Sequence, residues 1–320
     1  MPRRRQFAIG YGNDVSTADV ILNTGAYDFP AGRPMWPKYQ ARRAKLAADL
    51  WIGCHPDREA IMDACEQRGA NTLKAFRQFP SHYAFFRTNP PNPTKRYEFD
   101  SDRRLRSCLQ LSRLVRPSET GYYYSARVLR ERGRRREIVP YAARGIGTFA
   151  FSITEDDNWF GDDHVQALRR LLRAFDAAVL PDRVSRALWY HEYIFWTQMI
   201  DVRWPLCVTA LEALVHTDEK DRPPGRRLGS TEQFVRRLLK LKEFVRGIAW
   251  EEADLREIYD KRSGLVHGVG RGSDALTPES RRMYQLAENA LRTIIVDSIY
   301  RPAVADMFAS KATVRTSLGF

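Results

Sequence analysis

Apolar residues in the second half of the chain recur at steps of three and four, the spacing of helices that bury one face. Residues 164–180 follow this pattern through Val165, Leu168, Leu171, Leu172, Phe175 and Val179. Asp162 and Asp163 precede them and favour a helix N-terminus. Residues 183–216 are apolar around most of a helical circumference, with Pro205 within the stretch. This pattern predicts two buried core helices that are interrupted at Pro205.

Three more helices are predicted after a charged loop. Ser230, followed three residues later by Gln233, matches a capping box with Ser230 as the N-cap. A further helix is predicted over residues 251–267. Thr277 followed by Pro278 marks the start of the last predicted helix, because proline is well tolerated at the first helical position. That helix runs through the apolar stretch LRTIIVDSIY.

The first half of the chain has a mixed pattern. The sequence of residues 40–52, QARRAKLAADLWI, predicts a helix. From Tyr122 onward aromatic and β-branched residues become dense, which favours strands. Two such runs flank a polar tip containing Gly133, so we expect a β-hairpin there, with a third strand reaching Thr154.

An acidic, turn-rich segment, EDDNWFGDD, covers residues 155–163, and we expect the domain boundary there. The predicted fold class is therefore α+β. A basic, mixed α/β domain over residues 1–154 is followed by an all-α helical bundle over residues 155–320.

The charge of the chain is divided unequally between these parts. The sequence has 320 residues and a formal net charge of +13, from 52 Lys and Arg against 39 Asp and Glu. Residues 1–150 hold 27 of these basic residues and 14 of the acidic ones, which leaves 25 and 25 for residues 151–320. Since 27 − 14 = 13, the whole excess lies in the first half. Such a surface suits a polyanion, with nucleic acid first and an acidic membrane surface second.

Arginines dominate the basic clusters, and arginine binds phosphate in a bidentate manner better than lysine does. The densest group lies at the predicted hairpin tip and consists of Arg130, Arg132, Arg134, Arg135 and Arg136. We interpret these five as candidate RNA-binding residues. The alternative is that they form a solvated hairpin tip.

Composition excludes several classes of protein. With 43% hydrophobic and 28% charged residues the chain is globular rather than disordered. The longest stretch without a charged residue is residues 145–154, against the ~20 apolar residues of a membrane-spanning helix, so no membrane span is expected. No apolar run follows the basic start, and four scattered cysteines fit a reducing compartment, so we expect a cytoplasmic location.

No cofactor or metal is predicted. Cys54, His55 and Cys65 invite a zinc interpretation, but adjacent Cys and His lack the usual ligand spacing and a fourth ligand is missing. The Gly-x-Gly elements lack the strand and helix that flank a dinucleotide site.

The most informative segment lies near the end of the helix predicted over residues 251–267. Arg262 and His267 are separated by four residues, with Gly264 between them and Gly268 just after. Glycine in or near a helix costs about 1 kcal/mol relative to alanine, so these glycines need a reason. They either end the helix and permit tight packing, or let a substrate or partner chain approach closely.

The sequence Tyr-Asp-Lys-Arg-Ser-Gly-Leu-Val-His-Gly of residues 259–268 resembles the signature of HEPN domains, and most closely that of the ApeA-like branch. A second tract, RWPLCVTALEAL, resembles the preceding helix of that branch and contains Glu212. The resemblance covers roughly residues 163–309. Many HEPN domains are metal-independent endoribonucleases that act as homodimers.

The resemblance implies that Arg262 and His267 are catalytic. Arg262 would hold the phosphate oxygens, and His267 would act as general acid or base, because an imidazole exchanges protons near neutral pH. The expected RNA products carry a 2′,3′-cyclic phosphate and a 5′-OH. Supporting residues are Asp260, Ser263, Gly264, Gly268 and Glu212, of which Glu212 either orients the site or pairs with an arginine inside the bundle. Ser263 departs from the Asn, Asp or His that many HEPN nucleases have after the arginine.

Five residues at ~100° each place Arg262 and His267 about 140° apart on a regular helix. Either the glycines distort the helix, or the arginine side chain wraps back, or groups from two protomers meet. We therefore expect an RNA-cleaving HEPN homodimer, a prokaryotic defence or toxin-like effector controlled by an unknown trigger or inhibitor. The alternatives are a non-catalytic HEPN module that binds RNA or a nucleotide, and a DNA-binding regulator.

Overall fold

The computed structural model describes residues 15–24, 27–28, 33–34, 44–53, 58–67, 82–88, 99–117, 122–131, 136–145, 162–195, 197, 200–217, 228–267 and 277–319. The chain is α+β, with many helices and an antiparallel sheet. It divides into two compact units. The first comprises residues 1–112 and 118–169, and the second comprises residues 113–117 and 170–320. A domain boundary at residue 154 stays a prediction, because residues 146–161 lie outside the described part.

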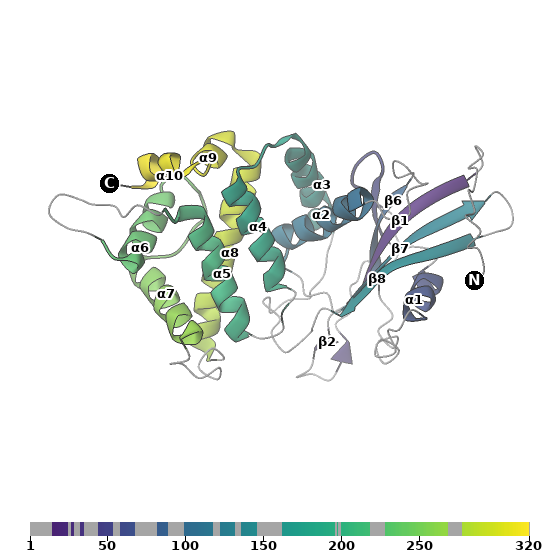
Figure 1. The fold of residues 1–320 in the computed structure, drawn as a ribbon, viewed down its shortest axis with the longest axis horizontal. Coiled ribbons are helices and arrows are strands. Elements are labelled where there is room, and N and C mark those ends of the chain that lie inside the picture. Colours follow the sequence, from purple (N-terminus) through teal and green to yellow (C-terminus); the bar gives the residue numbers. More distant parts are fainter. Residues whose placement is uncertain are drawn as a thin grey trace, which may run out of the picture. The chain divides into compact units, whose positions relative to one another are not determined.

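The first unit is built around an antiparallel sheet, in which the strand order over the described residues is β4-β5-β6-β1-β7-β8 (Figure 1). The strands are β1 (Val15–Thr24), β4 (Ala44–Lys45), β5 (Leu50–Gly53), β6 (His82–Thr88), β7 (Tyr122–Glu131) and β8 (Arg136–Gly145). A separate pair is formed by β2 (Tyr27–Asp28) and β3 (Arg33–Pro34). Helix α1 (Arg58–Glu66) packs against β7 and β8, and α2 (Phe99–Val115) precedes β7.

The predicted β-hairpin is confirmed, whereas the helix predicted over residues 40–52 is wrong. Strands β7 and β8 pair in antiparallel register from Tyr122 opposite Gly145 to Arg130 opposite Arg136. Residues 44–53 instead form β4 and β5, with Ala44 opposite Ile52. Pairing of β5 with β6 overrides the helical propensity of this alanine-rich segment. The third strand predicted to Thr154 lies outside the described residues.

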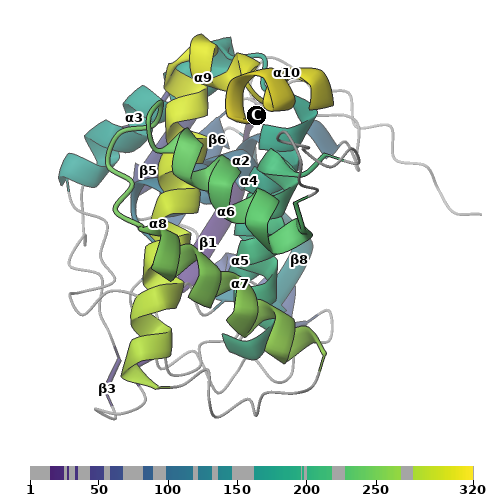
Figure 2. The ribbon, with the colours of Figure 1, turned by 90° about the vertical axis from the view of Figure 1, so that its left-hand side faces the viewer.

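The second unit is helical. Its elements are the end of α3 (Asp162–Ala177), then α4 (Asp182–Ile194), α5 (Ile200–Val215), α6 (Ser230–Leu241), α7 (Glu252–Val266), α8 (Pro278–Tyr300), α9 (Pro302–Asp306) and α10 (Lys311–Leu318). Helix α5 packs against α4, α6, α7 and α8, and Figure 2 shows α5 to α8 side by side. Within the described residues no helix is both long and apolar enough to cross a membrane.

Three sequence predictions about these helices are wrong: the interruption at Pro205, the N-cap of α6 and the last helix of the chain. Pro205 lies inside α5 and not between two helices. Proline there removes a single intrahelical bond, and the burial of Trp204 and Cys207 beside it compensates. The N-cap of α6 is Gly229 rather than Ser230, and Gln233 bonds back to the Leu228 carbonyl at 3.1 Å.

The start of α8 is as predicted, because Thr277 caps it by accepting a hydrogen bond from the Ser280 N–H at 3.2 Å. It is not the last helix, since α9 and α10 follow and bury Val304, Phe308 and Val314. The helices predicted over residues 164–180 and 251–267 are also confirmed, as α3 and α7.

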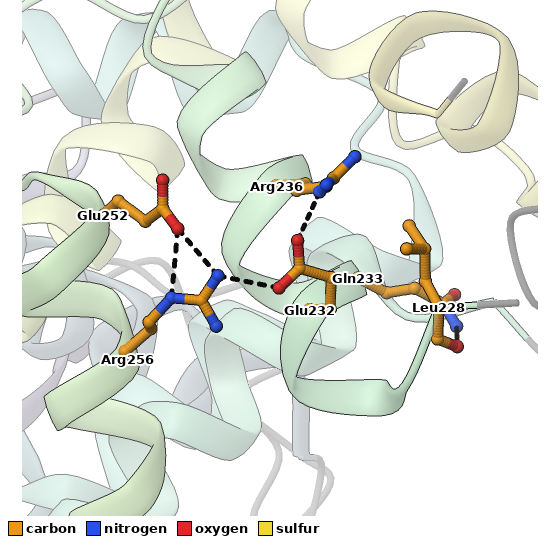
Figure 3. Close-up of polar contacts among 6 residues, drawn as sticks. All are labelled: Leu228, Glu232, Gln233, Arg236, Glu252 and Arg256. Atoms are coloured by element: carbon orange, nitrogen blue, oxygen red, sulfur yellow. Dashed lines mark hydrogen bonds and ion pairs between the residues drawn. The ribbon is translucent and has the colours of Figure 1, made fainter. Parts of the chain in front are cut away.

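Charged side chains join α6 to α7 (Figure 3). Arg256 of α7 donates to Glu232 of α6 and to Glu252, each at 2.7 Å. Glu232 also accepts a hydrogen bond from Arg236. The pKa of the Glu232 carboxyl is held below its ordinary value, first by the hydrogen bond from Arg256 and then by that from Arg236. This cluster links α6 to α7 at a partly exposed position.

We expect Glu232→Gln to lower the free energy of unfolding at pH 7 by up to about 1 kcal/mol. A carboxyl whose folded pKa is depressed stabilises the protein above its unfolded pKa, and this contribution is lost as pH falls through the folded pKa. The difference from the unsubstituted protein should therefore shrink below about pH 4.3. Urea unfolding at pH 7 and at pH 3 measures it. Glu243→Gln is the control, since Glu243 is 60% exposed and pairs with Lys240, three residues earlier; equal effects of both variants would contradict the assignment.

Candidate active site

An ion pair between α5 and α7 is the centre of the candidate site. Arg262 Nη2 donates to Glu212 Oε2 at 3.2 Å, and the two side chains are 24% and 23% exposed. The Arg262 guanidinium also lies 5.8 Å from the centre of the Tyr259 ring. Its Nε atom is buried and has no hydrogen-bond partner among the residues that the structure describes. The arginine is thus held in place while part of it stays accessible and one donor remains unused.

Tyr259 connects this pair to α6. Its ring lies 4.9 Å from that of Phe234, measured between centroids. Burial raises the pKa of the Tyr259 hydroxyl, and the negative charge of Glu212 raises it further, while Arg262 opposes this. The phenol therefore stays protonated beside the carboxylate and can serve as a hydrogen-bond donor.

His267 is the C-cap of α7, and its side chain is exposed. Its backbone N–H donates to the Ser263 carbonyl at 3.0 Å, and α7 continues through Gly264 to Val266. Gly264 therefore does not distort the helix, which removes one of the three ways of bringing Arg262 and His267 together. With a regular helix, His267 lies about 140° around the axis from Arg262.

The other predicted site residues differ in their burial and in their contacts. Glu212 is paired with Arg262 inside the bundle, as one of the two alternatives expected, and its role in orienting a site stays a prediction. Ser263 and Gly264 are partly buried on α7, and Asp260 is exposed. Gly268 lies outside the described residues.

A pocket of about 60 Å³ opens beside the ion pair, between α5, α6, α7 and the segment after α5. Its walls include Glu212, Thr217, Ser230, Gln233, Phe234 and Tyr259. The sequence drew attention to Glu212, Ser230, Gln233 and Tyr259 for other reasons, whereas Thr217 and Phe234 were not expected here. Their signal in the sequence is weak, because aromatic residues at helical spacing usually indicate core.

Two arginines hold the end of α5 next to this pocket. Buried Arg237 donates to the Val215 carbonyl at 2.6 Å and to Thr217 Oγ1 at 2.9 Å. Arg183 Nη1 donates to the His216 carbonyl at 2.7 Å. Burial lowers the pKa of Arg183, as do the charges of Arg186 and Arg237. Positive charge is therefore concentrated at this end of the bundle, where a phosphate would be attracted.

The candidate RNA-binding arginines belong to the first unit. Arg130 of β7 lies opposite Arg136, the first residue of β8, in the register pair nearest to the hairpin tip. Arg132, Arg134 and Arg135 lie outside the described residues. Among residues that the structure describes, no group of three or more His, Cys, Asp or Glu side chains could hold a metal ion. Cys54 and His55 lie outside that part of the chain, as does the side chain of Cys65.

Comparison with known protein families, with curated proteins and with solved structures finds no match for this chain.

Proposed function

We propose that this protein is a metal-independent endoribonuclease, acting in the cytoplasm as a defence or toxin-like effector. The observation that supports it best is the Arg262–Glu212 ion pair. It joins the two tracts of the chain that resemble a HEPN domain. The Arg262 guanidinium is held by a carboxylate and is partly exposed, and an exposed histidine follows at the end of the same helix. A cation and an imidazole suit the attack of a ribose 2′-hydroxyl on the adjacent phosphate.

Each group has a role in this reaction. The 2′-hydroxyl loses its proton to an imidazole and its oxygen attacks the adjacent phosphorus. The bond from phosphorus to the 5′-oxygen breaks, and that oxygen receives a proton. Arg262 stabilises the negative charge that builds on the phosphate oxygens. RNA is cut to 2′,3′-cyclic phosphate and 5′-OH ends, and DNA is not cut because it lacks the 2′-hydroxyl.

Glu212 acts as a positioning residue. It accepts a hydrogen bond from Arg262 Nη2 and leaves the other donors of the guanidinium fork directed elsewhere. A flexible arginine held in this way loses less conformational freedom when a phosphate binds.

A symmetric homodimer is part of the proposal. Since α7 is regular, Arg262 and His267 of one chain lie on different sides of the helix, and a twofold axis can bring one group from each protomer to the same phosphate. The exposed apolar Val266 beside His267 suits such a contact. Light scattering is expected to give the mass of a dimer at micromolar concentration. A monomer that cleaves RNA would contradict this arrangement.

The proposal is tested by incubating the purified protein with a mixed RNA pool in the presence of EDTA and mapping the product ends. Cyclic phosphate ends formed at an undiminished rate support it. Intact RNA would favour the second candidate, a non-catalytic RNA-binding or nucleotide-binding module, to which the wide angle between Arg262 and His267 also points.

We expect the hairpin arginines to supply much of the RNA affinity. Replacing Arg134, Arg135 and Arg136 by alanine should flatten the slope of log K against log salt by up to about 2, since each phosphate contact on a single strand contributes about 0.7. Binding is measured by fluorescence anisotropy at several salt concentrations. The control variant removes three exposed arginines of the helical unit, Arg173, Arg246 and Arg315. If both triple variants change the slope equally, only net charge matters and the tip has no special role.

A further inference from the structure

Helix α4 has two aromatic side chains on its exposed face. Trp189 and Tyr193 are 50% and 44% exposed, whereas tryptophan is highly buried on average. Their ring centroids lie 4.1 Å apart, with 43° between the ring planes. Tyr190 packs edge-on against Trp189 at 5.2 Å. The rings therefore hold one another in place while part of their surface stays open to solvent.

Positive charge lies beside these rings. Arg186 is exposed, and Arg186, Trp189 and Tyr193 stand at positions i, i+3 and i+7, which share one face of a helix. Arg183 lies one turn before Arg186. Burial lowers the pKa of the Arg183 guanidinium, and the charge of Arg186 lowers it further, so the two cations are near each other. Against these two arginines α4 has one acidic residue on this side, Asp182, so the face has an excess of positive charge.

This face begins at the end of α5 that holds the proposed site. Arg183 Nη1 donates to the carbonyls of Ala213 and Leu214 at 3.0 and 3.2 Å. These two residues directly follow Glu212, the partner of Arg262. Helix α4 packs along α5, so its first turn lies at the Glu212 end of α5 and the aromatic pair lies further along.

The chemistry and length of the face suit unpaired nucleotides. Aromatic rings stack on bases of any sequence, and arginine contacts the phosphates between them. The seven residues from Arg186 to Tyr193 span about 10 Å at 1.5 Å each. Stacked nucleotides follow one another at about 3.4 Å along a strand, so two neighbouring bases have room. Charge complementarity favours a polyanion, and the exposed rings favour one whose bases are unpaired.

We propose that Arg186, Trp189 and Tyr193 form a stacking platform for single-stranded RNA, in which the two rings stack on bases and Arg186 contacts a phosphate. The inference rests on the proposed endoribonuclease function. It adds a second contact region for the substrate, in the helical unit, and it implies that this contact is tolerant of sequence.

The test measures binding of a labelled, mixed-sequence 2′-O-methyl RNA oligonucleotide to the full chain by fluorescence anisotropy at several salt concentrations. This probe cannot be cut, because its 2′-oxygens are blocked. Trp189→Leu and Tyr193→Leu should each weaken binding at least about fivefold without changing the slope of log K against log salt, since stacking involves no ion release. Arg186→Ala should instead flatten that slope by about 0.7.

Matched variants separate stacking from other effects. Trp189→Phe and Tyr193→Phe keep a flat ring and should retain most of the affinity. Tyr300→Leu removes a tyrosine that is also 44% exposed, on α8, and should leave binding unchanged. Thermal melting monitored by circular dichroism confirms that each variant is folded.

The proposal is overturned if the leucine variants on α4 bind as tightly as Tyr300→Leu, or if the protein does not bind the oligonucleotide. It is also overturned if Trp189→Leu converts a dimer into a monomer in light scattering, because the face is then a contact between two copies of the chain. The outcome is separable from that of the nuclease proposal. Cleavage of RNA with normal binding by the leucine variants leaves the endoribonuclease and removes the platform. Binding that depends on the rings, without cleavage, leaves the platform and favours the non-catalytic RNA-binding module.

Discussion

Alanine in place of either Arg262 or His267 is expected to lower the rate of RNA cleavage by about 10²–10⁴-fold while the protein stays folded. His267 is exposed at the end of α7, so removing its imidazole deletes a proton-transfer group without leaving a hole in the core. Arg262 is partly buried, and removing it leaves Glu212 without this partner, so Arg262→Ala also lowers stability somewhat. Single-turnover cleavage of a labelled RNA, with circular dichroism on the same samples, separates the two effects.

Arg256 provides a matched control for this experiment. It is an arginine of the same helix, is held by Glu232 and Glu252, and lies outside the candidate site (Figure 3). Arg256→Ala should leave the cleavage rate within about twofold of the unsubstituted protein, since it removes only partly exposed ion pairs. Cleavage that survives both Arg262→Ala and His267→Ala, or that stops on addition of EDTA alone, would rule out the proposed mechanism.

Glu288→Ala is expected to be the most destabilising of the substitutions considered, by about 3–5 kcal/mol. Glu288 of α8 and His191 of α4 are both fully buried, and His191 Nε2 lies 2.9 Å from Glu288 Oε1. Burial raises the pKa of the Cys207 thiol, and the negative charge of Glu288 raises it further. Cys207 belongs to α5, so the carboxylate of Glu288 lies near that helix as well. Removing the carboxylate leaves a buried imidazole without its partner and opens a cavity between these helices.

Urea unfolding measures this effect, and two variants define its origin. Glu279→Ala on the same helix removes an exposed pair with Arg282 and should cost less than about 1 kcal/mol. Replacing His191 and Glu288 together by leucine should recover part of the loss, because the imidazole is then no longer stranded, while Arg292 still loses the carboxylate 3.8 Å from its Nε. A Glu288→Ala variant as stable as Glu279→Ala would show that the buried pair contributes nothing to the bundle.

Local sequence signals determined several elements of this protein correctly. The two aspartates in the first turn of α3, and Thr277 with Pro278 at the start of α8, predicted helix starts that the structure confirms. These signals work because capping and charge effects act within one turn, so no distant partner is needed. The β7–β8 hairpin is also local, since its strands are joined by a short tip.

The candidate site was predicted in its residue types but not in its arrangement. The sequence marked Arg262, His267 and Glu212, and left open whether Glu212 orients the site or pairs inside the bundle. The structure shows that Glu212 pairs with Arg262 between α5 and α7, and its role in orienting the site stays a prediction. It also shows that α7 stays regular through Gly264, which sequence reasoning could not decide.

Tertiary structure alone decided where the chain departs from its local preferences. Residues 50–53 form a strand because β6, about thirty residues later in the chain, satisfies their backbone hydrogen bonds, and residues 44–45 then pair with that strand. Pro205 is accommodated within α5 because the neighbouring side chains are buried by α7 and α8. The pocket exists because Arg237 of α6 binds the end of α5 over a separation of 22 residues. In each case the deciding partner is remote in sequence, so its energy is absent from any local pattern of hydrophobic and polar residues.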